Sequence, residues 1–250
     1  MKMKLAPDTI TTWIPPNWRL CTIPMFRDKE LYFDSMYGTC FPLEYDGRLF
    51  LITNKHILEN EKSFLGIRQL DGKFMPLPYD TVSEIGLNWV LHPSLDLAAI
   101  PMPVPILKDP YHWSIEEHHW NIDPQLTIGD DVAALGYPEK LFSNFADGTE
   151  GIFPIGMPGK ISSFDDVWIK CSCNIQKGAS GGPLFLKNSK GTAYLAGIVK
   201  GYGEENDPTI GRCIRIKHVK TILDSDEMKN QIKALEKKIQ GLRNERNSNP

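Results

Sequence analysis

A serine surrounded by small residues stands within Lys-Gly-Ala-Ser-Gly-Gly-Pro-Leu, positions 177–184. A nucleophile for acyl transfer must expose its hydroxyl near backbone N–H groups that converge on one point, because these groups bind the negative oxygen of the tetrahedral intermediate. Flanking glycines allow the backbone conformation and the close approach that this needs. Ser180 is therefore the candidate nucleophile, and the N–H groups of Gly178 and Ser180 are the candidate oxyanion donors. Alone, the segment could also be a glycine-rich turn.

A serine hydroxyl needs a base, and the base needs an orienting group. His56 follows an apolar run at 49–53 that predicts a buried strand, and the end of a strand holds an imidazole rigidly. Asp96 stands between two leucines, where a carboxylate is expected to be partly buried and to need a partner. Alone, His56 could be a structural histidine and Asp96 a turn cap. Together with Ser180 they predict a catalytic triad that needs no cofactor.

Two other groups contain residue types that bind metals. Glu116-Glu117-His118-His119 lacks the i, i+4 histidine pair of a zinc-binding helix, so we expect a solvated loop or short helix there. Cys171 and Cys173 point to the same face of an expected strand, which favours a place in the core. We therefore predict no metal site.

Composition limits the possible partners and location of the chain. A net charge of −3 from 28 basic and 31 acidic residues gives no electrostatic reason to expect nucleic acid. No run of about 18 apolar residues predicts a membrane span. The first 13 residues lack the apolar stretch of a secretory signal, and the cysteine count of 5 is odd. We expect a cytoplasmic protein with reduced thiols. A processed, secreted chain is the alternative, and the initial methionine argues against it.

Short apolar runs separated by Gly, Pro and Asp predict an all-β fold, a sandwich or a barrel. The dipeptide Asp46-Gly47 favours a tight hairpin turn. The segment 109–120 resembles no strand, and we place a boundary between two lobes at 120–127. Strands are expected at 41–45, 49–53, 132–135, 167–173, 183–186, 194–200 and 212–216.

A helix is expected after Leu223. Its apolar residues are spaced 4, 3, 4 and 3 apart, with charges between them. About two heptads are too few for a coiled coil, so we expect the apolar stripe to pack on the chain's own barrel. Association with a partner or a second copy through 224–246 is the alternative. The apolar residues are Met228, Ile232, Leu235, Ile239 and Leu242.

Five segments, in order and spacing, resemble the trypsin-like serine peptidases, most closely the bacterial stand-alone and HtrA-type members. The resemblance extends from about Gly38 to Ile222. It implies a chymotrypsin-like double β-barrel, a serine endopeptidase and a protein or peptide substrate. The implied units are an N-terminal extension (1–22), a first barrel (23–122), a second barrel (123–222) and a C-terminal helix (223–250). The segments are Gly38–Phe41, Leu51–His56, Asp96–Ala98, Gly129–Pro138 and Gly178–Pro183.

The resemblance also implies a substrate pocket. Its floor is expected near Asn174, whose neutral side chain argues against strong selection for Arg or Lys. Tyr202 is expected to narrow the mouth. The implied substrate-binding residues are Asn174, Gln176, Lys200, Gly201 and Tyr202.

The chain departs from the family at three points. Cys40 has no partner cysteine beside His56, which supports a reduced compartment. Ala179 replaces the aspartate that pairs with a newly cut N-terminus in digestive members, so we expect no activation of that kind. No room for a PDZ domain follows Ile222.

Two alternative functions also fit parts of the sequence. The same fold can be a catalytically silent module that binds peptides or recruits partners. An α/β-hydrolase would also fit Gly178–Gly182, with Asp207 and His218 after it, but it needs a helix directly after the serine. The Gly-Gly-Pro sequence followed by an apolar strand argues against that fold. A cytoplasmic protease must be restrained, and 109–120 and the C-terminal helix are candidate gates.

Overall fold

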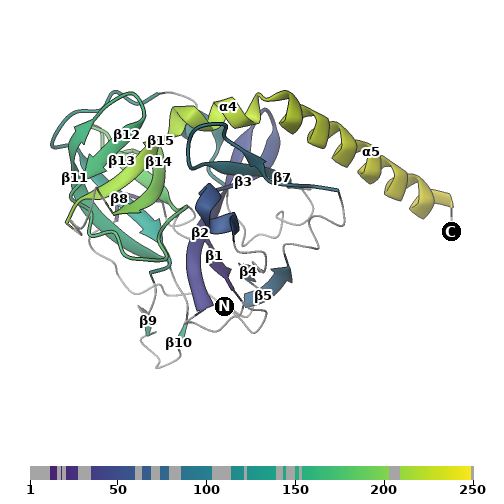
Figure 1. The fold of residues 1–250 in the computed structure, drawn as a ribbon, viewed down its shortest axis with the longest axis horizontal. Coiled ribbons are helices and arrows are strands. Elements are labelled where there is room, and N and C mark those ends of the chain that lie inside the picture. The colour runs from purple at the N-terminus through teal and green to yellow at the C-terminus, as the bar shows by residue number, and fades with distance from the viewer. Residues whose placement is uncertain are drawn as a thin grey trace.

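The chain folds into two β units followed by a helical C-terminal segment (Figure 1). The structure is a computed structural model. It describes residues 12–15, 18, 21–27, 35–59, 64–68, 74–78, 86–102, 114–120, 123–138, 143–144, 150–151, 154–202 and 209–248.

The first unit is a curled, seven-stranded antiparallel sheet in the order β5-β4-β1-β2-β3-β7-β6. The turn between β2 and β3 has positive φ at Asp46 (49°) and Gly47 (68°), which confirms the predicted hairpin. The strands are β1 (Ile23–Phe26), β2 (Met36–Tyr45), β3 (Arg48–Thr53), β4 (Phe64–Arg68), β5 (Phe74–Pro78), β6 (Val90–Leu91) and β7 (Ala98–Met102).

The second unit is a closed six-stranded barrel in the order β11-β12-β15-β14-β13-β8. Five of its strands lie where the sequence predicts them, and β11 was not predicted. A short ribbon of β9 (Ser143–Asn144) and β10 (Glu150–Gly151) precedes β11. The barrel strands are β8 (Asp131–Gly136), β11 (Ile155–Phe164), β12 (Trp168–Cys171), β13 (Pro183–Lys187), β14 (Ala193–Tyr202) and β15 (Gly211–Arg215).

A shared apolar cluster joins the two units. It combines buried residues of the first sheet, such as Phe41 and Phe50, with Leu135 and Phe185 of the barrel. Trp18, which precedes β1, is 1% exposed and stacks on Phe185 at 5.3 Å between ring centroids. Burial of this apolar area stabilises the contact, so residues from the two units keep fixed relative positions. All five cysteines are buried free thiols; Cys171 and Cys173 lie in the barrel core, as predicted.

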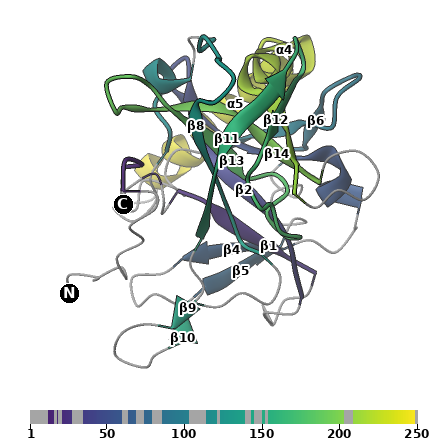
Figure 2. The ribbon, with the colours of Figure 1, turned by 90° about the vertical axis from the view of Figure 1, so that its left-hand side faces the viewer.

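Three short 3₁₀ helices and two α-helices complete the described chain: η2 (Lys55–Glu59), η3 (Glu117–His119), η4 (Ile216–His218), α4 (Val219–Leu223) and α5 (Asp226–Ser248). Figure 2 views the molecule from the barrel side, and α5 extends away from the viewer behind the barrel strands. No helix in the described ranges combines the length and apolar character needed to cross a membrane.

The apolar stripe of α5 packs against the rest of the chain along its first half. Met228 is fully buried and Leu235 is 8% exposed, with Ile232 and Ile239 packed beside them. Arg48 of the first sheet pairs with Glu236 at 3.1 Å. These contacts confirm that the stripe packs on the chain's own β unit. The far end of α5 extends beyond the body of the molecule (Figure 1), and the side chain of Leu242 lies outside the described residues.

Candidate active site

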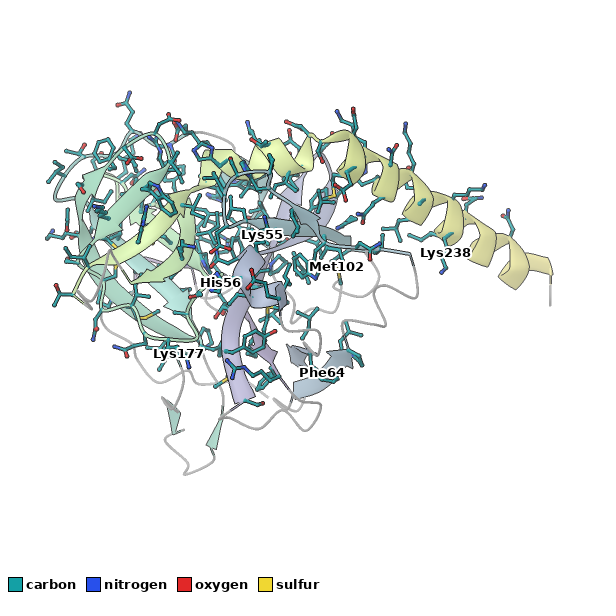
Figure 3. All side chains as sticks on the ribbon, in the orientation of Figure 1. Lys55, His56, Phe64, Met102, Lys177 and Lys238 are labelled. Atoms are coloured by element: carbon teal, nitrogen blue, oxygen red, sulfur yellow. The ribbon has the colours of Figure 1, made fainter. Side chains whose placement is uncertain are left out.

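His56 lies in η2, directly after β3, as the sequence predicts. Thr53 and Asn54, between the strand and the histidine, are fully buried. The Asn54 side-chain amide donates to the backbone carbonyl of Asp96 at 2.8 Å. This bond ties the histidine turn to the aspartate turn. Figure 3 shows His56 where the first unit faces the barrel.

Asp96 lies in a tight turn that ends just before β7 and is shaped by His92. The His92 ring is 5% exposed, and its Nδ1 accepts the backbone N–H groups of Ser94 at 3.2 Å and Leu95 at 3.0 Å. The backbone N–H of His92 donates to the backbone carbonyl of Leu97 at 2.9 Å, and this hydrogen bond closes the turn. Desolvation by burial lowers the pKa of His92, so the ring stays neutral and Nδ1 remains an acceptor at neutral pH.

His56 and Asp96 contact each other through two bonds. The ring Nδ1 lies 2.6 Å from Oδ2 of Asp96, and the backbone N–H of His56 donates to Oδ1 at 2.9 Å. Burial alone would raise the pKa of Asp96. The bonds from His56 and from Lys200 outweigh it and hold the pKa of this carboxyl well below its usual range. Asp96 is therefore a carboxylate at neutral pH, and it fixes the orientation of the imidazole.

Ser180 follows a glycine turn between β12 and β13. The Ala179 N–H donates to the Gln176 carbonyl at 3.1 Å, and Gly178 has a φ of 93°. This bond and this φ are those of a type II turn, which requires a residue without Cβ strain at its third position. Within the described chain, the N–H groups of Gly178 and Ser180 donate to no acceptor. Both predicted oxyanion donors are thus without an acceptor in the described chain.

Thr39 of the first sheet anchors the Ser180 turn across the two units. Its N–H donates to the Ser180 carbonyl at 2.8 Å, and its hydroxyl donates to the Gly178 carbonyl at 2.9 Å. The same hydroxyl accepts the Tyr137 N–H at 3.1 Å. Gly181 approaches Thr39 so closely that a Cβ on it would lie 2.0 Å from the Thr39 carbonyl oxygen. The turn is therefore held by backbone contacts that allow no side chain at Gly181.

Lys200 on β14 contacts both halves of the predicted triad. The Ser180 hydroxyl donates to its carbonyl at 3.0 Å, and its ammonium lies 2.6 Å from Oδ2 of Asp96, the same oxygen that His56 contacts. Among the described residues, no hydrogen bond joins Ser180 to His56. The structure thus brings His56 and Asp96 into direct contact and links Ser180 to them through Lys200.

The other residues predicted to bind substrate lie around the same turn and strand. Asn174 is exposed and accepts a bond from the Gln176 side-chain amide at 3.0 Å. Gly201 has a φ of 138°, and a Cβ there would lie 3.6 Å from the Ser180 hydroxyl oxygen. The backbone of Tyr202 ends β14, and its side chain lies outside the described residues. Their part in binding substrate remains a prediction.

Sequence reasoning missed three residues that build this site: Thr39, His92 and the side chain of Lys200. In the sequence, Thr39 stands only within the family segment Gly38–Phe41, and Lys200 only among the implied substrate-binding residues. A polar residue inside an otherwise apolar strand is the one local signal for Thr39, which is fully buried. Nothing in the neighbourhood of Lys200 in the sequence points to Asp96.

No protein-family model and no curated protein matches the chain. Among solved structures it is similar to two crystal structures of the protease Rv3671c, both of an inactive form. The structure of a serine-to-alanine mutant from M. tuberculosis H37Rv has a TM-score of 0.53 at 18% identity, covering 89% of this chain and 94% of that one. The other structure has a TM-score of 0.52 at 18% identity, with 89% and 96% covered. The chain therefore has a chymotrypsin-like fold, a curled half-barrel and a closed barrel with a C-terminal helix.

Proposed function

We propose that the protein is a serine endopeptidase in which Ser180 is the nucleophile and His56 the general base. The observation that carries the proposal is that two hydrogen bonds join His56 to Asp96 in a chain with a chymotrypsin-like fold. Because Nδ1 of the ring faces the carboxylate, Nε2 is left as the basic atom, and it makes no hydrogen bond within the described chain.

The proposed reaction begins when the Ser180 hydroxyl leaves the Lys200 carbonyl and gives its proton to Nε2 of His56. The Ser180 oxygen attacks the peptide carbonyl, and the N–H groups of Gly178 and Ser180 bind the developing oxyanion. His56 then protonates the leaving amine, and water hydrolyses the acyl-enzyme by the reverse sequence. Asp96 stays ionised throughout, since its pKa lies well below its usual range, and it stabilises the imidazolium.

A fluorophosphonate probe tests this proposal directly. The probe phosphonylates a serine only where a base activates it, so the native protein should be labelled at Ser180, as peptide mass spectrometry would show. The variants Ser180→Ala and His56→Ala should remain unlabelled. Labelling of the His56→Ala variant at the native rate would contradict the assigned base.

One observation favours a second candidate, a catalytically silent module that binds peptides. The Ser180 hydroxyl donates to Lys200 rather than to His56, and the Lys200 ammonium shares the carboxylate oxygen that orients the base. A folded protein that resists the probe, yet binds an extended peptide in a fluorescence anisotropy titration, would support this function over the first.

The substrate of the proposed enzyme is a protein or peptide, and its side-chain preference follows from the pocket residues. Asn174 carries no charge to pair with Arg or Lys, and its amide is bonded to Gln176. We expect cleavage after small or medium apolar residues. Strict cleavage after Arg in a peptide library would contradict this preference without affecting the triad.

Association through 224–246 is a further part of the proposal. Met228 and Leu235 pack on the β unit, so the outward face of α5 and its far end remain to contact a partner. A chain ending at residue 239 keeps the packed turns and should elute as a smaller species than the full chain in size-exclusion chromatography with light scattering. An unchanged oligomeric state would argue against association through this end.

A further inference from the structure

We propose that Glu116, His118 and His119 form a Zn²⁺ site on the segment that runs between the two β units. The three side chains each offer one ligand atom, and these atoms lie within 4.8 Å of one another. Two imidazoles and a carboxylate are a donor set that Zn²⁺ accepts in proteins, with a fourth position left for water.

The spacing of the donor atoms suits a shared ion better than a direct bond. Oε2 of Glu116 and Nε2 of His119 are 3.6 Å apart, beyond hydrogen-bond distance. Two ligands on a tetrahedral Zn²⁺ with bonds of about 2.0–2.2 Å lie roughly 3.4 Å from each other. The rings of His118 and His119 have centroids 3.9 Å apart and an interplanar angle of 42°. Small side-chain rotations therefore suffice to bring all three donors to one ion.

None of the three side chains is committed to another hydrogen bond within the described residues. Glu116 precedes η3 without a side-chain capping bond. His118 is exposed, and Nδ1 of His119 is buried without a partner.

The sequence argued against a metal here because the histidines are not four residues apart on a helix. The structure changes that conclusion. Glu116 is extended and precedes η3, whereas His118 and His119 lie in the 3₁₀ turn, and one ligand atom of each of the three side chains still lies within 4.8 Å of the others.

The proposed ion would brace the crossing segment against both units. On one side, Ile115 exchanges backbone bonds with β2, to the Pro42 carbonyl at 3.1 Å and from the Glu44 N–H at 3.0 Å. On the other side, the His119 ring meets the edge of Trp18 at 4.5 Å and faces Tyr194 of β14 at 6.2 Å between centroids. Fixing the His119 ring fixes the segment to the barrel.

This site is separate from the proposed triad. Tyr194 and Lys200 both lie on β14 and are six positions apart. Because a strand rises about 3.3 Å per residue, this separation corresponds to roughly 20 Å along the strand. Zn²⁺ would bind there whether or not the protein is a protease, and its binding is measured without an activity assay.

Metal binding by the chelator-treated full chain tests the proposal. In a calorimetric titration we expect one Zn²⁺ per chain at micromolar affinity. Co²⁺ in its place should give visible d–d absorption without the intense near-ultraviolet band of a thiolate, because the five cysteines are buried elsewhere. A Zn²⁺ concentration about a hundredfold above Kd should raise Tm by on the order of 5–10 °C.

Two variants and two controls locate the ion. His118→Asn and Glu116→Gln alter side chains on the surface, and each should weaken Zn²⁺ binding at least tenfold while circular dichroism is unchanged. Glu227→Gln removes an equal charge on α5 and should bind like the native chain. His56→Asn removes an imidazole that also lies beside a carboxylate, and this variant should also bind Zn²⁺ normally. Absence of Zn²⁺ binding, or its loss in His56→Asn but not in His118→Asn, would overturn the proposal.

Discussion

The two β units build their halves of the candidate site by different means. In the first unit, side chains do the positioning: Asn54 and His92 shape the turns, and the carboxylate of Asp96 holds the His56 ring. In the barrel, the Ser180 turn is positioned by backbone groups and by two glycines with positive φ, Gly178 and Gly181.

This difference predicts which kind of substitution disrupts each half of the candidate site. The first half fails when a polar side chain is removed, because a buried partner then loses its bond. The second half fails when a Cβ is added, because the backbone has no room for it. Thr39 and Lys200 cross between the halves, and each reaches the other unit through a hydrogen bond.

The largest effect is expected in the first half, from Asp96→Asn. An asparagine keeps the shape but does not favour the Nδ1–H tautomer of His56 or stabilise its cation, so kcat should fall by about 10⁴. Steady-state cleavage of a peptide substrate measures this fall. Asp131→Asn breaks an exposed ion pair with Lys160 and should leave kcat unchanged. A loss of less than tenfold in Asp96→Asn would show that the two bonds of Asp96 are only structural.

The effect of Asp96→Asn on the free energy of unfolding should depend on pH. The folded-state pKa of Asp96 lies below its unfolded value near 3.9, so the ionised group stabilises the fold above about pH 4. That stabilisation disappears as pH falls through the folded-state pKa. The native chain should exceed Asp96→Asn by roughly 2 kcal/mol in the free energy of unfolding at pH 7, and this difference should shrink below pH 4. Urea unfolding at both pH values measures it.

The next largest effect is expected in the barrel half, from Gly181→Ala. Alanine at a φ of 86° costs about 1–2 kcal/mol, and the contact with the Thr39 carbonyl adds about 1–3 kcal/mol more. Gly191→Ala is the matched control, since Gly191 has a φ of 78° and nothing within 4 Å of its Cβ position. The midpoints of urea unfolding of the two variants separate the cost of the positive φ from the cost of the contact with Thr39. Equal destabilisation by both substitutions would mean that the close approach to Thr39 is easily relieved.

A smaller effect is expected at the contact between the halves, from Thr39→Val. The substitution keeps the volume but removes the hydroxyl bonded to the Gly178 carbonyl, which costs about 1–3 kcal/mol. A looser Ser180 turn should also lower kcat roughly tenfold to a hundredfold with little change in KM. Thr39→Ser keeps the hydroxyl and should recover most of both losses. A kcat unchanged in Thr39→Val would show that the Ser180 turn holds its geometry without this bond.

The sequence predicts those parts of the site that local patterns determine. The hairpin at Asp46 is recognisable from its immediate neighbours. His56, Asp96 and Ser180 are recognisable only when the three local patterns are taken together. Thr39 and Lys200 are not, because their partners Gly178 and Asp96 lie 139 and 104 residues away. Strand β11 has a mixed pattern of burial that no period of two describes, so it was not predicted. The contacts of Thr39 and Lys200 and the pairing of β11 depend on residues far apart in the sequence. A local sequence pattern therefore does not predict them.

The smallest effect is expected from Lys200→Met. Methionine keeps much of the apolar stem but removes the ammonium from Oδ2 of Asp96, which leaves the full carboxylate charge to the His56 ring. The stronger field of the carboxylate favours the imidazolium. The acidic limb of the plot of kcat/KM against pH should therefore move up by about half to one pH unit. The matched control is Lys160→Met, which breaks the exposed pair with Asp131 and should leave the limb in place. An unshifted limb in Lys200→Met would mean that the ammonium and the ring do not compete, and that the bond between Lys200 and Asp96 only joins the two β units.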